Sequence, residues 1–421
     1  MSEITLSEDT ADNAKRFEER LKRIEDTIAL RETDRVPIMY HAIFWHATYA
    51  GITFREAMYN YAKVSSIMKE VVLELQPDAV AAPHRRTLLG PTMELMGYQQ
   101  MLWPGHGVGV NYSYQHIDHE YMKPEEYNDY IEDPDWFYFT RYLPRVAEAF
   151  APMSQLPRLA SAQRLSILGL TTFFTDEMAA SFARLADAGR EMGQALHSAA
   201  AFDAELTALG FPLDQVVSAY APFDYFADNM RGAKGIMLDL FRRPNQLLAA
   251  MNRAIPIIIK AIIERAAETP CKMVFFAIHW GLDGFMSPDQ FKTFFWPQLR
   301  RVLISLIDAG LVPQVYWEGD CTSRLETIAD IPAGRAIYFF ERTDLFRAKA
   351  ILGDVVCVRG NVPASMLNTG TPDDVRDYCR KLIEGVGKNG GFILDGGIGI
   401  PDEARLENVK AMFHAVHEFR A

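Results

Sequence analysis

The chain has 421 residues, of which 49% are hydrophobic, so it is long and apolar enough for one large barrel or two ordinary domains. Its formal net charge of -12 argues against a nucleic-acid partner, because phosphate binding needs a basic face. We expect no signal peptide and no membrane span, since the longest apolar segment, residues 247–263, contains Arg253, Pro256 and Lys260. The four cysteines show no CxxC spacing, which favours a reduced cytoplasmic protein.

The N-terminal segment predicts a helical extension. Between residues 11 and 31, Phe17, Leu21, Ile24 and Ile28 recur at spacings of three or four, as on one face of an amphipathic helix. We expect this helix to pack on the outside of the main domain. The predicted domains are therefore an extension at residues 1–34 and a single barrel at residues 35–421.

From residue 36 onward, short apolar runs alternate with helical patterns. Strands are predicted at residues 36–40 and 78–82 with a helix over 53–75 between them, which predicts parallel pairing through a right-handed crossover. Further strand candidates lie at residues 165–169, 215–219, 272–277, 312–317, 336–340, 355–359 and 391–395. This alternation predicts an α/β fold, a (β/α)8 TIM barrel, with one candidate more than a barrel needs.

Residues 84–135 interrupt the alternation. They are rich in Gly, Pro, Tyr and His and follow neither the helical nor the strand period. Long irregular segments are usually functional or disordered, and the aromatic content here favours order. We interpret this segment as an insertion over the barrel mouth.

Active sites of such barrels lie at the carboxyl ends of the strands, so the residues just after each strand are the candidates. In chain order these are Tyr40, His41, Trp45, His46, His84, Arg85, Arg86, Asp224, Tyr225, His279, Trp280, Asp283, Tyr316, Glu318, Asp320, Glu341, Asp344, Asn361 and Asp395. Those expected to contact substrate are Tyr40, Trp45, Arg85, Asp224, Tyr225, Trp280, Tyr316, Asn361 and Asp395. A mouth rich in His, carboxylates and aromatic rings suits a small, partly apolar ligand.

His279 and Glu318 follow neighbouring strands, so they could share a zinc ion. Zinc binds imidazole nitrogen and carboxylate oxygen, and a catalytic site needs three protein ligands and an open position. Glu341 is the preferred third ligand, with Asp395 and Cys321 as alternatives. The competing interpretation is structural: His279 bonds a loop and Glu318 caps a turn.

Two histidines are candidate general acids. His41 and His84 each follow a predicted strand, and imidazole changes its charge near neutral pH. Arg85, beside His84, suits a substrate carboxylate or a cofactor phosphate through bidentate contacts. A plain structural or solvated role is the alternative for each of them.

Several segments together resemble the uroporphyrinogen decarboxylase superfamily. They are Pro222-Phe223-Asp224, Trp317-Glu318-Gly319-Asp320, Gly360-Asn361-Val362 and the glycine-rich stretch at residues 390–401. That superfamily includes decarboxylases and cobalamin-linked methyltransferases. Its thiol-activating methyltransferases carry a His-x-Cys-Gly motif and a later Cys, where this sequence reads Tyr316-x-Glu318 and Ile398. The resemblance therefore does not extend to a zinc–thiolate site.

The resemblance also disfavours a porphyrinogen as substrate. Porphyrinogen decarboxylases place an Arg-rich segment after the first strand and an Asp on the second-strand loop. Here residues 39–46 contain no Arg, and His84-Arg85-Arg86 contains no Asp. A substrate with many carboxylates would lack partners, and an unpaired buried charge is costly. What remains is similar to the methyltransferase branch, in particular to O-demethylase components.

The resemblance implies that the chain moves a methyl group from a small methylated compound, a methoxylated aromatic above all, to the cobalt of a separate corrinoid protein. Zinc at Glu318, or a proton from His41 or His84, would activate the leaving oxygen. The Asp-x-His-x-x-Gly motif of corrinoid-carrying domains is absent from the sequence, so the corrinoid is expected on the partner. A decarboxylase of a non-porphyrin acid and a non-catalytic corrinoid- or tetrapyrrole-binding protein are the alternatives, and a homodimer is one candidate assembly.

Overall fold

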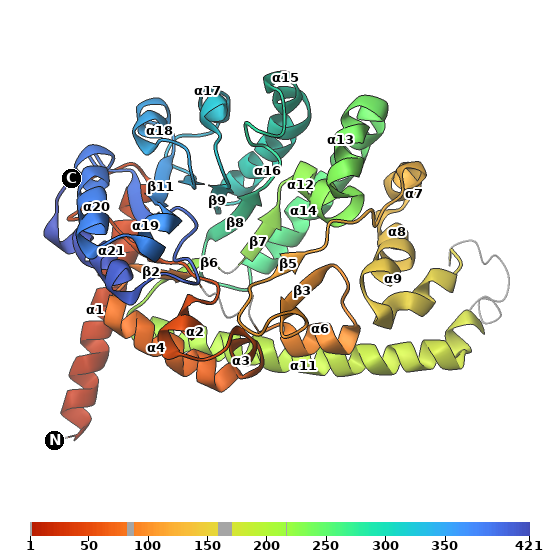
Figure 1. Ribbon diagram of the computed structural model, residues 1–421, viewed down its shortest axis with the longest axis horizontal. Coiled ribbons are helices and arrows are strands. Elements are labelled where there is room, and N and C mark those ends of the chain that lie inside the picture. Colours follow the sequence, from red (N-terminus) through yellow and green to blue (C-terminus); the bar gives the residue numbers. More distant parts are fainter. Residues whose placement is uncertain (1, 82–87, 159–170, 216) are drawn as a thin grey trace.

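Parallel strands form a closed barrel in this computed structural model, which describes residues 2–81, 88–158, 171–215 and 217–421 (Figure 1). The strands are β1 (Met39–Tyr40), β2 (Ala79–Ala81), β6 (Leu213–Gln215), β7 (Val217–Tyr220), β8 (Met273–Ile278), β9 (Val312–Trp317), β10 (Ile337–Phe340), β11 (Cys357–Val362) and β12 (Phe392–Gly396). Pairing runs from β1 through β2 to β6 and from β7 through β8, β9, β10 and β11 to β12. A parallel bridge between Ile38 and Leu394 joins the two edges. β6 and β7 are one residue apart and overlap the single strand predicted at residues 215–219, so together they occupy one barrel position and the (β/α)8 prediction is confirmed.

The surplus strand candidate, residues 165–169, lies outside the described residues. The other predicted strands are confirmed, with ends that differ by a few residues. The first of them shrinks to the two residues of β1, because Val36 and Pro37 only lead into the barrel.

Helices cover the outside of the barrel between the strands. They are α2 (Trp45–Ala50), α3 (Phe54–Tyr59), α4 (Tyr61–Leu75), α11 (Asp176–Ala208), α12 (Pro222–Phe226), η6 (Ala227–Arg231), α13 (Gly232–Arg242), α14 (Pro244–Ala266), α15 (Pro288–Gln290), η7 (Phe291–Phe295), α16 (Trp296–Asp308), η8 (Thr322–Arg324), α17 (Leu325–Ile328), α18 (Leu345–Leu352), α19 (Ala364–Thr369), α20 (Pro372–Gly385) and α21 (Leu406–Glu418). By length and composition alone, α14 is the one helix among the described residues that could cross a membrane. Its residues Leu247, Met251 and Ile255 pack in the main core, as expected for a barrel helix.

The N-terminal helix α1 (Ser2–Ile28) closes the bottom of the barrel. Ile24 and Ile28 pack in one cluster with Met39 and Met273, which face inward from the first residues of β1 and β8. The expectation that this helix packs on the outside of the barrel is therefore wrong. The end of α1 plugs the amino-terminal end of the strands, where an open barrel would expose apolar side chains.

A long stretch between β2 and α11 departs from the alternation of strands and helices. Its elements are α6 (Gly90–Met96), β3 (Met101–Pro104), β4 (Gly107–Val108), β5 (Gln115–His116), η1 (Pro124–Glu126), α7 (Tyr127–Glu132), α8 (Pro134–Phe137), η2 (Tyr138–Tyr142), α9 (Leu143–Val146), η3 (Glu148–Gln155) and η5 (Thr171–Phe174). It bonds the segment after β7, through Met122 N to Met230 O at 2.7 Å and Ala233 N to Asp118 Oδ1 at 2.8 Å. The insertion predicted at residues 84–135 is thus part of a longer stretch that ends where α11 begins.

A buried ionic layer crosses the barrel interior. Arg359 of β11 donates to Asp214 Oδ2 at 2.8 Å, to Gln314 Oε1 at 2.8 Å and to Asp395 Oδ2 at 2.8 Å, and all three charged side chains are 0% exposed. Burial raises the pKa of Asp395 to about 6, against the lowering effect of Arg359. The prediction that Asp395 contacts substrate is therefore wrong: its carboxylate serves Arg359 below the mouth.

Replacing Arg359 by methionine should destabilise the protein by about 3–5 kcal/mol, because two buried carboxylates would lose their partner. Urea unfolding at pH 7 measures the change. Arg376→Met is the matched control, since Arg376 pairs with Glu418 on an exposed surface, where the loss of stability should be much smaller. Equal stabilities of the two variants would contradict a structural role for the layer.

Candidate active site at the barrel mouth

The short helical segment after β7 holds the residues that follow β8. Asp224 is fully buried, and its carboxyl oxygens accept the backbone N–H groups of His279 at 3.0 Å and Trp280 at 3.3 Å. One helical turn later, Asp228 takes the side chains of the same two residues: His279 Nδ1 at 2.6 Å and Trp280 Nε1 at 2.6 Å. Residues four apart in a helix lie on one face, which allows both carboxyl groups to reach one strand end. The backbone and the rings of His279 and Trp280 are thereby fixed.

The carboxyl groups of Asp224 and Asp228 lie in different environments. Burial, and then the charge of Asp228, raises the pKa of Asp224 to about 8. Asp224 therefore binds a proton at neutral pH, which removes one buried charge beside Asp228. The remaining charge on Asp228 is matched by the imidazole of His279.

His279 is held as an imidazolium. Burial lowers its pKa, but the hydrogen bonds to Asp228 and Glu318 outweigh burial and raise the pKa to about 11. Its Nε2 lies 3.5 Å from Glu318 Oε1, and the side chains of His279 and Glu318 remain 35% and 40% exposed. A distance of 3.5 Å is too long for a strong hydrogen bond, so the Nε2 proton stays available to a ligand. The mouth thus presents a positive N–H group to solvent.

His116, at the tip of the insertion, lies within electrostatic range of Asp228 and His279. The protein around it lowers its pKa, although the side chain is open to solvent. Sequence reasoning missed both His116 and Asp228. A signal for Asp228 exists, because it follows Asp224 by one helical turn; His116 had none, since its position depends on how the insertion folds back.

An aromatic layer forms the floor below this charge. Phe275, Tyr316 and Phe339 face inward from β8, β9 and β10, with centroids 6.1 Å apart for Phe275–Tyr316 and 4.5 Å for Tyr316–Phe339. His41 lies on the layer, 5.9 Å from the rings of Phe275 and Phe339. Burial, and then the nearby Glu318, Glu341 and Asp395, raises the pKa of Tyr316, so its hydroxyl stays neutral.

A cleft of about 460 Å³ opens beside the floor, between the loops after β10, β11 and β12. Glu341, Arg342 and Asn361 line it. The carboxylate of Glu341 accepts Gly319 N at 2.6 Å and Arg342 Nε at 3.2 Å, while the Asn361 amide donates to Thr343 O at 2.9 Å. Glu341 and Asn361 therefore brace the neighbouring loops at the mouth.

Two residues predicted to contact substrate, Tyr40 and Trp45, point elsewhere, whereas Tyr225 lies beside Tyr138 and Tyr142. Tyr40 alternates with inward-facing Met39 and His41, so its ring is buried among the surrounding helices. Trp45 begins α2 and donates its indole N–H to Ala404 O at 2.8 Å, and Tyr225 packs against Phe226 with ring centroids 5.3 Å apart. The prediction considered only which residues follow each strand. Strand alternation and helix packing decide where the side chains point, and they explain these differences. His84 and Arg85 lie outside the described residues.

The predicted zinc ligands are only partly assembled. Among the described residues, no group of three or more His, Cys, Asp or Glu side chains is arranged to hold a metal ion. His279 Nε2 and Glu318 are neighbours, and the bond of Nδ1 to Asp228 is compatible with a metal at Nε2. The carboxylate of Glu341, the predicted third ligand, instead accepts Gly319 N. Cys321 is buried, with its thiol 3.3 Å from Thr343 Oγ1. This donor set does not fit zinc as it stands, and no step below is routed through a metal.

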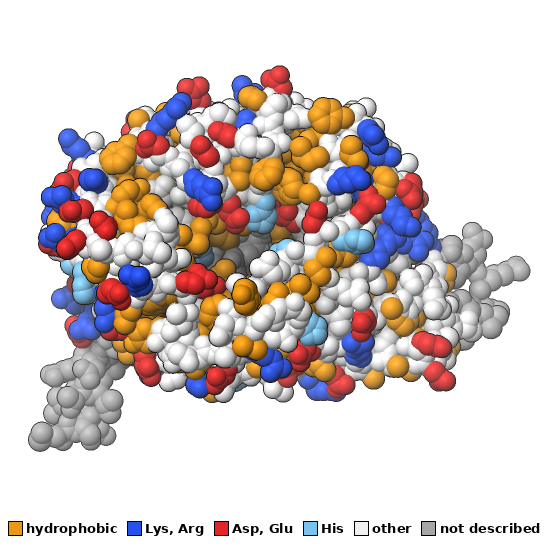
Figure 2. All heavy atoms as spheres, viewed as in Figure 1, with side chains coloured by type: hydrophobic (Ala, Val, Ile, Leu, Met, Phe, Trp, Pro, Cys, Tyr) orange, Lys and Arg blue, Asp and Glu red, His pale blue; other side chains and the backbone are white. Residues whose placement is uncertain are grey.

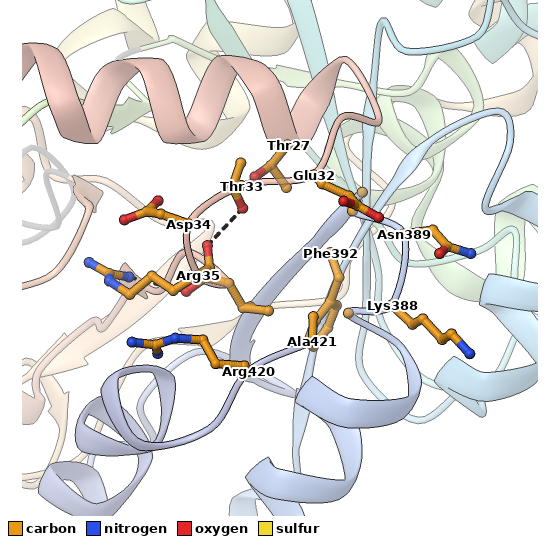
Figure 3. Close-up of a pocket in the computed structure, with 14 residues that line it drawn as sticks. Thr27, Glu32, Thr33, Asp34, Arg35, Lys388, Asn389, Phe392, Arg420 and Ala421 are labelled. Atoms are coloured by element: carbon orange, nitrogen blue, oxygen red, sulfur yellow. Dashed lines mark hydrogen bonds between the residues drawn. The ribbon is translucent and has the colours of Figure 1, made fainter.

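A second cleft, of about 260 Å³, lies at the opposite end of the barrel (Figure 3). It is lined by residues that precede β1 and β12, among them Thr33, Arg35 and Lys388. Arg35 is already paired with Asp78 at 2.6 Å. The amino-terminal face of a TIM barrel is the face that supports stability, so we place the active site at the mouth instead.

Comparison with known proteins identifies the family of the chain. Residues 178–419, more than half of the chain, match the family model described as uroporphyrinogen decarboxylase (URO-D). The chain therefore belongs to the uroporphyrinogen decarboxylase family. It is 29% identical over 192 residues to the uroporphyrinogen decarboxylase of Methylococcus capsulatus, covering 45% of this chain and 52% of that protein. The corresponding Pseudoalteromonas translucida protein is 30% identical over 145 residues, covering 34% and 40%.

The chain thus matches about half the length of these relatives or less. Among solved structures, a methyltransferase from Methanosarcina mazei superposes with a TM-score of 0.62 at 18% identity, covering 94% of this chain and 97% of that chain. That likeness shows the fold, and the similarity extends over almost the whole of both chains.

We expect Asp228→Asn to lower the pKa of His279 by at least about one unit, because a carboxylate that bonds the imidazolium would be lost. The raised pKa means that the ion pair stabilises the fold fully below the ordinary pKa near 6.5, and that this stability disappears as the pH rises through about 11. Nitrogen-15 NMR of the imidazole from pH 6 to 12 measures the titration.

Asp289→Asn is the control for that measurement, since Asp289 is exposed at α15, away from His279. It should leave the imidazole signals of the wild type unchanged. If Asp228→Asn leaves them unchanged as well, the proton on His279 does not depend on Asp228.

Proposed function

We propose that the chain is a methyltransferase that moves a methyl group from a small methylated substrate, a methoxylated aromatic above all, to the cobalt of a corrinoid held by a separate protein. The observation that carries the proposal is the imidazolium of His279, fixed by Asp228 at an open barrel mouth above an aromatic floor. The structural likeness to a methyltransferase supports the same reaction class.

The chemistry is a displacement at the methyl carbon. The bond between methyl carbon and ether oxygen breaks, its electron pair stays on the oxygen, and the methyl group bonds to cobalt(I) through the electron pair of the metal. A phenolate leaves more readily when it is protonated, and phenols have a pKa of about 10. His279, with a pKa of about 11, matches such a leaving group and stabilises its developing negative charge.

Each neighbour of His279 has a defined part in this proposal. Asp228 orients the ring through Nδ1, so that Nε2–H points to the mouth. Glu318, 3.5 Å from Nε2, balances the charge of the imidazolium between turnovers, and the substrate oxygen then replaces Glu318 as acceptor of the Nε2 proton. His279 is the acid in this proposal, since His41, one of the two predicted acids, lies in the aromatic floor. His84, the other predicted acid, lies outside the described residues.

His279→Gln should lower turnover by about 100-fold, since it removes both the proton and the positive charge. Glu318→Gln should lower turnover less than His279→Gln, because the imidazolium keeps its bond to Asp228. The assay follows methyl-cobalt formation by absorbance from 2-methoxyphenol and a cobalt(I) corrinoid. Glu403→Gln, exposed in the loop after β12, is the control and should retain full turnover.

Two alternatives are separated by the same incubation. The relatives carry the name uroporphyrinogen decarboxylase, which favours loss of carbon dioxide from a smaller acid as the second candidate. Carbon dioxide without methyl-cobalt would establish that reaction, and tight corrinoid binding without turnover would establish a non-catalytic binder. If the protein keeps full activity in a chelator, zinc at Glu318 is rejected. If a chelator abolishes the activity and added zinc restores it, the proposal that His279 alone activates the leaving oxygen is rejected.

A further inference from the structure

Tyrosines gather at one side of the mouth and have no part in the reaction described above. Tyr98, Tyr138 and Tyr142 come from the insertion and Tyr220 from the end of β7; we call these four the tyrosine wall. The family match begins at residue 178, so three of the four lie outside the part of the chain that the family accounts for. The family therefore supplies no role for them.

A buried glutamine fixes the wall. Gln100 Oε1 accepts the hydroxyl of Tyr98 at 3.1 Å and that of Tyr142 at 2.8 Å, and its Nε2 donates to Asn229 O at 3.1 Å. Tyr138 packs on Tyr142 with ring centroids 4.6 Å apart. Because Asn229 follows Asp228 directly, the wall is tied to the segment that holds His279.

The wall borders the open part of the mouth. Tyr220 pairs with Ala277 in the parallel register of β7 and β8, and His279 follows on the same face of β8. Tyr138 and Tyr220 are 37% and 39% exposed, and the side chain of Ser218, below Tyr220, is exposed too. The space-filling view shows this face hollowed, with histidine side chains around the hollow (Figure 2). A ligand between the wall and His279 would contact both.

The wall is uncharged. Burial, and then neighbouring tyrosines, raises the pKa of Tyr98, Tyr138 and Tyr142, so their hydroxyls stay neutral. The groups that act on these three pKa values are tyrosines and Gln100, with no Lys or Arg of the described chain among them. A carboxylate buried against the wall would lack a countercharge, which is costly, whereas a neutral hydroxyl or ether oxygen can accept from a phenol.

We propose that the tyrosine wall is the subsite for a neutral aromatic ring with a hydroxyl or second ether oxygen, and that it selects the methyl donor. The orientation of the ring in this subsite rests on the proposed function. The ring packs edge-to-face or offset on Tyr220 and Tyr138, geometries that aromatic pairs prefer. Its methoxy oxygen then points toward Nε2 of His279, while its other oxygen substituent takes a hydrogen bond from the wall.

Binding of 2-methoxyphenol, measured by calorimetry without any corrinoid, tests the subsite independently of turnover. Tyr220→Ala should weaken binding by about tenfold and Tyr220→Phe by less, because the phenylalanine keeps the ring. Tyr112→Ala is the control, since Tyr112 is 68% exposed on the insertion away from the wall, and it should bind as the wild type does. Tyr138→Ala serves in the same way as Tyr220→Ala if the latter does not fold.

Charge discrimination gives a second measurement. At pH 7 wild type should bind 4-methoxyphenol at least about tenfold more tightly than 4-methoxybenzoate, because with the methoxy group at His279 the para carboxylate faces the wall, which offers it no cation. Equal binding of the two probes, no binding of 2-methoxyphenol, or unchanged binding in both alanine variants would overturn the subsite.

These results separate the subsite from the proposed reaction. Tyrosine-dependent binding without methyl transfer would leave the subsite standing and overturn the methyltransferase. Methyl transfer from methanol or a methylamine, without binding of 2-methoxyphenol, would do the reverse.

Discussion

The fold depends on a guanidinium buried in the middle of the barrel. Arg359 reaches from β11 to carboxylates on β6 and β12 and to Gln314 on β9, so one side chain ties strands from opposite parts of the closed sheet. Charges that are buried in this way are tolerated only when every partner is in place. The layer therefore fixes the relative positions of the strands. The rings of the aromatic floor, which lie directly above the layer on these strands, are fixed with them.

Above the floor, charge is arranged by two aspartates that differ only in environment. Asp224 is buried against backbone N–H groups and binds a proton at neutral pH, because burial raises its pKa, while Asp228 bonds the imidazole of His279. If both were ionised, two negative charges would compete for one imidazolium. Their separation leaves a single, well-oriented positive N–H group at the mouth, where a developing negative charge can be stabilised without reorganisation.

Two parts of the chain contribute to the site, namely the part that matches the family and the insertion. The family match covers residues 178–419, which supply Asp224, Asp228, His279 and Glu318. The insertion before residue 176 supplies three of the four tyrosines of the tyrosine wall. This division fits the way TIM barrels diversify, in which the loops at the mouth vary while the barrel is maintained.

The sequence by itself determined the barrel and the order of its strands, because apolar runs with the strand period and helix-start signals such as Ser287-Pro288 are local features. It placed His279, Glu318 and Tyr316 at strand ends that do meet. Only the tertiary structure decided that Asp395 serves Arg359, that Tyr40 faces outward and that α1 plugs the barrel. Those outcomes depend on which strands close the barrel and on how side chains alternate across it, and the insertion brought His116 and the tyrosine wall to the mouth through contacts that no local pattern records.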